Sequence, residues 1–229
     1  MRMAAPITYI LVTVRGRPEF TERCVRALLT NSYGDQRLVV VDNGSRDATL
    51  DVLYRVFRRG DIHRLICNKV DTIPQWEKSY AICQAVHSLR MDHHDYFAWV
   101  DNDVEVKPGW LKVAQIVLNA RTDVQVVSMH NDSRQEKFHP TREIIKVDGI
   151  DVRMKDTANG AAWVMRKEFF DMYGLPPTGL GITEDGTEDW YYSKVMHERK
   201  IPFAVVGGYS EHLGYERSLK KQALNGEKR

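Results

Sequence analysis

Five short apolar runs in the first half of the sequence alternate with segments of helical periodicity, which limits what the chain can fold into. The apolar runs are residues 7–13 (ITYILVT), 37–41 (RLVVV), 62–67, 96–100 (YFAWV) and 124–129. The segments between them, with apolar side chains at helical spacing, are residues 19–29, 50–57, 75–89 and 108–118. Uninterrupted apolar strands separated by helices are typical of a parallel sheet that helices cover on both faces. We therefore predict an α/β fold, with Pro108 in the first turn of the fourth helix.

The second half is less regular and predicts shorter elements. These are a strand or hairpin over residues 144–152, a strand over 161–165, a helix over 167–173, a helix over 187–200 and a strand over 203–206. Residues 175–186 are rich in glycine and proline, which favours a loop that could close over a ligand. Since no repeat or linker interrupts the pattern, we expect one domain over residues 1–214 and a basic C-terminal tail over residues 215–229. A solvated, frayed chain end is enough to explain the basic residues of this tail.

Composition excludes several classes of protein. Hydrophobic residues make up 43% and charged residues 28%, which is typical of globular chains. The net charge of +2 weighs against a general nucleic-acid binder, although the basic tail keeps a DNA partner open. The three cysteines, Cys24, Cys67 and Cys83, suggest a reducing compartment without a disulfide framework or zinc site. No apolar run approaches the roughly 20 residues of a membrane helix, so we expect no transmembrane segment and a cytoplasmic location.

Acidic residues follow the fourth predicted strand directly, in the order Asp101, Asn102, Asp103. Two carboxylates two residues apart, just past a buried strand, can share a hard divalent cation such as Mg2+ or Mn2+. Such ions usually complete their coordination with substrate phosphates and water. Parallel sheets also bind ligands at the carboxyl ends of their strands. The position of the motif therefore favours a metal and phosphate site over a pair of solvated turn residues.

A second acidic turn follows the strand over residues 37–41. Ser45 is expected to cap the next helix, and Asp47 to be favoured there by the helix dipole, whatever the function. Asp42, at the end of the strand, is then free to accept a hydrogen bond from a ligand such as a nucleobase. The turn therefore adds a ligand contact to the predicted binding edge.

Two further groups lie in the second half. Glu188 and Asp189 fall in the first turn of a predicted helix, where the helix dipole holds a carboxylate ionised and lowers its pKa. Desolvation by a closing loop would raise that pKa, so one of them, Asp189 before Glu188, is a candidate general base. His212 follows the last strand and could fold back as a nitrogen ligand, which would fit manganese better than magnesium.

Taken together, the motifs resemble those of family 2 glycosyltransferases. They are DNGSRDAT (residues 42–49), DND followed by PGW (101–110), GAA (160–162), RKEFF (166–170) and ED (188–189), in the order of that family. The likeness spans residues 7–214 and implies the GT-A fold, which is Rossmann-like with a mixed, mostly parallel sheet flanked by helices. It implies a metal-dependent enzyme, with Mn2+ or Mg2+, that moves a hexose or pentose from a UDP- or GDP-linked donor to an acceptor hydroxyl.

The resemblance also implies roles for residues on the donor side. Asp42 would contact the nucleobase, with Thr13 and Arg15 at the neighbouring strand end. Asp101 would serve the ribose, the metal and the diphosphate, with Asn102 beside it. Further donor contacts would come from Asn68, Gln75 and Lys78, in a segment that departs from the family's common Asn-x-Gly pattern.

The remaining roles concern the metal and the chemistry. Asp103 would be the direct metal ligand and His212 a late one, as in some GT-A enzymes. Asp189 would deprotonate the acceptor hydroxyl, which gives inversion at the anomeric carbon. The acceptor is open among a glycan, a small molecule, a protein and a hydroxylated DNA base.

Two other functions stay open from sequence. A nucleotidyltransferase acting on a sugar phosphate would use a similar sheet but needs a glycine-rich, lysine-bearing first turn. The turn over residues 14–18 (VRGRP) supplies a single glycine. A non-catalytic nucleotide-sugar binding module is the third possibility, and turnover distinguishes it from an enzyme.

Overall fold

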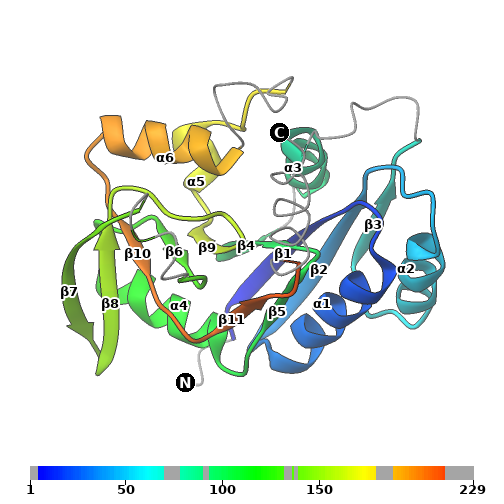
Figure 1. Ribbon diagram of the computed structural model, residues 1–229, viewed down its shortest axis with the longest axis horizontal. Coiled ribbons are helices and arrows are strands. Elements are labelled where there is room, and N and C mark those ends of the chain that lie inside the picture. The colour runs from blue at the N-terminus through cyan, green and yellow to red at the C-terminus, as the bar shows by residue number, and fades with distance from the viewer. Residues whose placement is uncertain are drawn as a thin grey trace, which may run out of the picture.

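A mixed β-sheet forms the centre of the computed structural model (Figure 1). The structure describes residues 5–69, 78–89, 93–131, 136, 139–178 and 188–214. Within these residues the sheet has the order β3 (Arg64–Cys67), β2 (Asp35–Asp42), β1 (Ile7–Val14), β4 (Tyr96–Asp101), β9 (Ala162–Arg166), β6 (Val126–Ser128), β10 (Phe203–Val205), β8 (Ile150–Lys155) and β7 (Thr141–Val147). A separate two-stranded sheet joins β5 (Val104–Val106) to β11 (Ser210–His212).

The four strands β3, β2, β1 and β4 are parallel, as the alternating pattern predicts. Their register brings the carboxyl ends together, because Val14 lies opposite Asp42 and Thr13 lies opposite Asp101. Polar residues that follow these strands therefore share one edge of the sheet.

The other half of the sheet differs from a simple parallel continuation. The fifth predicted strand, β6, does not pair with β4, because β9 lies between them and is antiparallel to both. β8 likewise runs antiparallel to β10 and β7. Apolar composition indicates that a strand is buried but says nothing about its direction, so the sequence could not predict this insertion. The mixed, mostly parallel α/β fold is nevertheless confirmed.

Helices cover both faces of the sheet, as the uninterrupted apolar strands predict (Figure 1). One face packs on α1 (Pro18–Asn31), α2 (Thr49–Arg58) and α4 (Trp110–Ala120), and the other on α3 (Lys78–Ser88), α5 (Phe169–Tyr173) and α6 (Glu188–Glu198). Successive residues of a strand alternate between the two faces. In β1, Ile10 and Val12 join the first layer of helices, while Tyr9 and Leu11 join the second.

The beginning of α4 corrects one prediction. Pro108 lies before the helix and not in its first turn, because α4 starts at Trp110 after Gly109. Gly109 has a φ of 84°, a left-handed conformation that glycine adopts without a Cβ clash. None of the helices in the described part of the chain combines the length and apolar character that crossing a bilayer requires.

Trp163 in β9 offers a test of the second layer. Its side chain is fully buried, with ring centroids 5.0 Å from Trp99 and 5.2 Å from Phe203, and its Nε1 donates to the Asn159 carbonyl at 2.6 Å. We expect Trp163→Ala to lower the free energy of unfolding by about 3–5 kcal/mol, measured by urea denaturation. Trp190→Ala is the control, because that ring is 46% exposed. An equal loss in both variants would contradict this account of the core.

Candidate functional site

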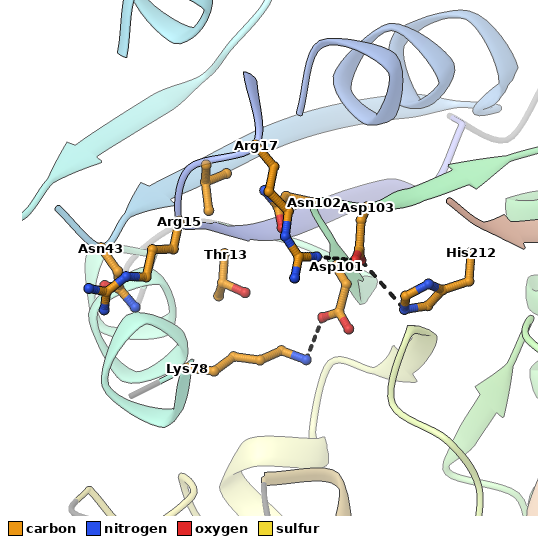
Figure 2. Close-up of a pocket in the computed structure, with 10 residues that line it drawn as sticks. Thr13, Arg15, Arg17, Asn43, Lys78, Asp101, Asn102, Asp103 and His212 are labelled. Carbon is orange, nitrogen blue, oxygen red and sulfur yellow. Dashed lines mark hydrogen bonds and ion pairs between the residues drawn. The ribbon is translucent and has the colours of Figure 1, made fainter. Parts of the chain in front are cut away.

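A pocket of about 500 Å³ opens at the carboxyl ends of β1, β2 and β4. Figure 2 shows that charged side chains from separate segments point into it. Its lining residues are Thr13, Val14, Arg15, Arg17, Asn43, Lys78, Asp101, Asn102, Asp103 and His212. The pocket therefore lies at the edge of the sheet where the sequence places a binding site.

The acidic motif is fixed by the end of β4. Asp101 is the last residue of that strand, and Asp103 directly precedes β5. Between them, Asn102 turns inward, and its Nδ2 donates to the Gly16 carbonyl at 3.1 Å and to Thr21 Oγ1 at 2.9 Å. The amide thus ties the loop after β1 to the motif, while the two carboxylates face the pocket (Figure 2).

His212 reaches the same place from the far end of the described chain. β11 pairs with β5 so that His212 lies opposite Val104, and the Leu213 N–H donates to the Asp103 carbonyl at 2.7 Å. This pairing puts His212 Nε2 3.5 Å from Asp103 Oδ1. The sequence could only suggest a return of the chain, and the short second sheet provides it.

Asp101, Asp103 and His212 are a suitable set of metal ligands. One potential ligand atom from each lies within 4.8 Å of the others. Two carboxylate oxygens and an imidazole nitrogen are donors that Mn2+ accepts, and oxygen donors also suit Mg2+. The residues present therefore fit a divalent cation of this kind.

Lys78 connects this motif to the second half of the chain. Its ammonium group forms an ion pair with Asp101 and another, at 2.7 Å, with Glu188 Oε1 at the start of α6. Nζ also lies 4.6 Å from the centroid of the Trp99 ring. Burial opposes the charge on Lys78, but Asp101 and Glu188 outweigh it and raise the pKa of Lys78 above its usual range. Burial raises the pKa of Asp101 to about 6, although Lys78 acts in the opposite direction.

Asp189 lies beside Glu188 but has different contacts. Its Oδ2 accepts a hydrogen bond from the Gly160 N–H at 3.1 Å, and the next carbonyl, of Ala161, accepts the Asp101 N–H at 3.0 Å. A Cβ at Gly160 would lie 2.6 Å from the Asp189 Cβ, so this approach requires a glycine. The first turn of α6 therefore meets the same sheet edge as Asp101, with Glu188 buried and Asp189 half-buried.

The prediction that Asp42 is free to contact a ligand is wrong. The side chain is fully buried, and its Oδ2 accepts the N–H groups of Gly44 at 3.1 Å and Ser45 at 3.0 Å. The Ser45 hydroxyl donates to Asp42 Oδ1 and accepts the Gly16 N–H at 2.7 Å, so Ser45 does not cap α2 as predicted. Asp42 instead closes its own turn, and the following residue, Asn43, lines the pocket.

The other predicted donor residues are placed as follows. Thr13 and Arg15 line the pocket, and Asn68 lies behind Asn43, donating from Nδ2 to Asn43 Oδ1 at 3.1 Å. Gln75 lies outside the described residues, as do Thr187, residues 179–186 of the predicted loop and the basic tail.

Sequence reasoning missed Arg17 and Asn43. Arg17 Nη1 forms an ion pair with Asp103 Oδ2, and Figure 2 shows the Arg17 side chain extending into the pocket toward Asp103. The available signal was the turn over residues 14–18, which holds two arginines at the binding edge. Nothing in the one-dimensional pattern distinguishes which arginine side chain reaches the carboxylates.

Comparisons with known proteins show the family through a family model and the fold through solved structures. The family model described as "Glycosyl transferase family 2" matches residues 9–175. Among solved structures, the chain resembles the mannosyltransferase PcManGT from Pyrobaculum calidifontis in complex with GDP-Man and Mn2+, with a TM-score of 0.62, 17% identity and coverage of 90% of this chain and 56% of that one. It also resembles residues 1–349 of S. aureus TarS, with a TM-score of 0.60, 14% identity and coverage of 89% and 59%.

A third structure, GalNAc-T7 with UDP, GalNAc and Mn2+, has a TM-score of 0.63, 12% identity and coverage of 89% of this chain and 43% of that one. The chain thus spans about half the length of these three chains. At such identities the likeness concerns the fold. No match to the sequence was found among curated proteins.

The two ion pairs of Lys78, with Asp101 and with Glu188, form a bridge that can be tested through its effect on stability. Lys78→Met leaves Asp101 and Glu188 without their shared cation, and removing one partner of a buried pair commonly destabilises by about 3–5 kcal/mol. Since Lys78 is 21% exposed, we expect the lower end of that range at pH 8 in EDTA, measured by urea unfolding. Lys146→Met, which removes an exposed pair with Asp151, should leave the free energy of unfolding unchanged within error.

The loss in Lys78→Met should be smaller at pH 5. Because the pKa of Asp101 is raised from 3.8 to about 6, its protonated form favours the folded state, and that contribution is lost as pH rises between those values. With a pKa of about 6 the Asp101 carboxyl is mostly protonated at pH 5 even in the wild type, so removing Lys78 leaves less uncompensated charge there than at pH 8. An equal loss of unfolding free energy in Lys78→Met at both pH values would contradict the role assigned to the ion pair of Lys78 with Asp101.

Proposed function

Because the chain belongs to glycosyl transferase family 2, we propose that it transfers a sugar from a nucleotide-sugar donor to an acceptor hydroxyl with the help of a divalent metal. The observation that carries the proposal is the convergence of distant segments at one edge of the sheet. The end of β4 and the strand β11 bring Asp101, Asp103 and His212 to one pocket, and the first turn of α6 adjoins this pocket because Glu188 forms an ion pair with Lys78, which lines it.

The metal is Mn2+ or Mg2+, held by Asp103 and His212 with Asp101 beside them. When bound, such an ion neutralises the charge that develops on the departing nucleoside diphosphate. Asp103 has a buried side chain at the base of the pocket, which keeps the carboxylate in a fixed place. The similar structures of PcManGT with GDP-Man and Mn2+ and of GalNAc-T7 with UDP and Mn2+ support both the ion and a GDP- or UDP-linked donor.

The nucleoside end of the donor lies against β1 and the turn after β2. Thr13, Arg15 and Asn43 line that side of the pocket, and Arg15 and Asn43 lie side by side in Figure 2. Asn68 orients Asn43, and Gln84 Nε2 in turn donates to Asn68 Oδ1 at 2.9 Å. We assign base contacts to Asn43 because Asp42, which sequence suggests for this role, is buried in its turn.

Asp189 is the general base in this proposal. Glu188 Oε1 is engaged by Lys78, whereas Asp189 is half-buried at the sheet edge beside Gly160. An acceptor hydroxyl placed there would pass its proton to Asp189 as its oxygen attacks the anomeric carbon, which breaks the bond to the diphosphate in a single displacement. One displacement inverts the configuration at that carbon.

Metal and donor binding are tested together by thermal and chemical stability. In the presence of Mn2+, the correct UDP- or GDP-sugar at 100 times its Kd should stabilise the protein by about 2.7 kcal/mol. Asp103→Ala should abolish both this shift and any Mn2+-dependent donor hydrolysis, whereas Asp61→Ala, at an exposed position before β3, should keep them. Retention of both by Asp103→Ala would contradict the proposed ligand.

The base is tested by kinetics. Asp189→Asn should lower kcat by about 10²–10⁴-fold while the Kd of the donor stays near that of the wild type, because the lost group acts on the acceptor proton. A larger loss in Glu188→Gln than in Asp189→Asn would reverse the assignment.

Product analysis distinguishes the alternatives. Transfer from a nucleoside triphosphate to a sugar phosphate would indicate a nucleotidyltransferase, and donor binding without turnover would indicate a binding module. Reactions offered a glycan, a small alcohol and a hydroxymethylated DNA separate the acceptor classes.

A further inference from the structure

Arg17 combines a fixed backbone with a long, exposed side chain. Its N–H donates to Asp47 Oδ2 at 3.1 Å, and its carbonyl accepts the Thr21 N–H at 2.9 Å where α1 begins. Its backbone φ of 62° lies in the left-handed region, which few residues other than glycine, asparagine and aspartate adopt. The backbone is thus held at both ends, while the side chain is 56% exposed. The backbone hydrogen bonds therefore fix the position from which this long cationic side chain extends into the pocket.

The guanidinium of Arg17 pairs with one of the two carboxylate oxygens of Asp103. Arg17 Nη1 pairs with Asp103 Oδ2, while His212 Nε2 approaches the other oxygen, Oδ1 (Figure 2). Gly214 closes over the pair, since a Cβ there would lie 2.4 Å from Asp103 Oδ2 and 3.3 Å from Arg17 Nη1. Arg17 is therefore bound at the carboxylate that is proposed to hold the metal.

Among the described residues that line the pocket, neither of the other two lysine or arginine side chains, Lys78 and Arg15, is in the same position. Lys78 is mostly buried and tied between Asp101 and Glu188. Arg15 points toward Asn43, away from Asp103, in Figure 2. Of these three, Arg17 alone joins an exposed side chain to the proposed metal ligand.

We propose that Arg17 is an exchange cation: it neutralises Asp103 before the metal binds, and it moves to the donor diphosphate when the metal takes its place. This inference rests on the proposed function. A divalent ion and a guanidinium repel each other at one carboxylate, which favours displacement of Arg17 when the ion binds. The planar guanidinium matches phosphate oxygens in a bidentate manner, and a diphosphate beside the ion would be within the same pocket. Arg17 thus acts as a positioning residue for the donor.

The exchange predicts opposite effects of one substitution on two ligands. For Mn2+ alone, measured by calorimetry without nucleotide, Arg17→Gln should bind about tenfold more tightly than wild type, because the competing charge is gone. Arg17→Lys keeps a cation and should stay within about twofold of wild type. Arg15→Gln makes the same change of charge in the same pocket away from Asp103, and should change Mn2+ affinity by less than about twofold.

For GDP and UDP at saturating Mn2+, Arg17→Gln should instead bind about tenfold more weakly or worse, because charge-assisted contacts to the diphosphate are lost. Tighter Mn2+ with weaker nucleotide in the same variant is the signature of an exchange. A residue that only supports the fold would weaken both ligands, and circular dichroism of each variant checks its folding.

Three outcomes overturn the proposal. Mn2+ binding by Arg17→Gln that equals or falls below that of wild type would show that Arg17 does not compete with the ion. Unchanged affinity for GDP and UDP would show that it does not move to the diphosphate. If wild type binds Mn2+ no better than Asp103→Ala does, the proposed metal site is wrong and the exchange is wrong with it. If Asp103→Ala loses Mn2+ binding but Arg17→Gln gives either of the first two results, the metal site stands and only the exchange is wrong.

Discussion

Asp101 and Asp103 present two carboxylates in a largely buried turn at the end of a central strand, and their charge must be balanced by cations. Lys78 balances Asp101, and Arg17 balances Asp103. Each of these pairs also joins parts of the chain. Lys78 reaches Glu188 in α6, and the loop that carries Arg17 leads into α1. Charge compensation at this turn therefore links both layers of helices to one edge of the sheet.

The parts of the fold and site that follow from strand ends could be predicted from the sequence. Apolar runs ending in acidic turns placed Asp101 and Asp103 at a shared edge, because parallel strands align their carboxyl ends. Pairing of β11 with β5 is a contact between distant segments, and the sequence could only suggest that His212 returns to the motif. The direction of β9 could not be predicted at all, since a buried strand is equally apolar in either direction.

Side-chain roles were harder to predict than positions. Asp42 was placed correctly at the end of its strand, yet its carboxylate is used by Gly44 and Ser45 within its own turn. A short acidic side chain in a turn can bond its own backbone or a ligand, and the same sequence is compatible with both. Arg17 illustrates the converse, because a charged residue of an unremarkable loop reaches Asp103 through the path of the backbone.

Two glycines show how the backbone makes room for this chemistry. Gly160 lets Asp189 approach the start of β9, and Gly214 lets the chain pass over Asp103 and Arg17. In both places an added Cβ would fall within 3 Å of the acidic side chain, so the positions of the two carboxylates depend on the absence of a side chain at Gly160 and Gly214. The proposed base and the proposed metal ligand are thus placed in the same way. In each case a glycine beside a strand end, Gly160 before β9 and Gly214 after β11, leaves room for the backbone to pass close to the carboxylate.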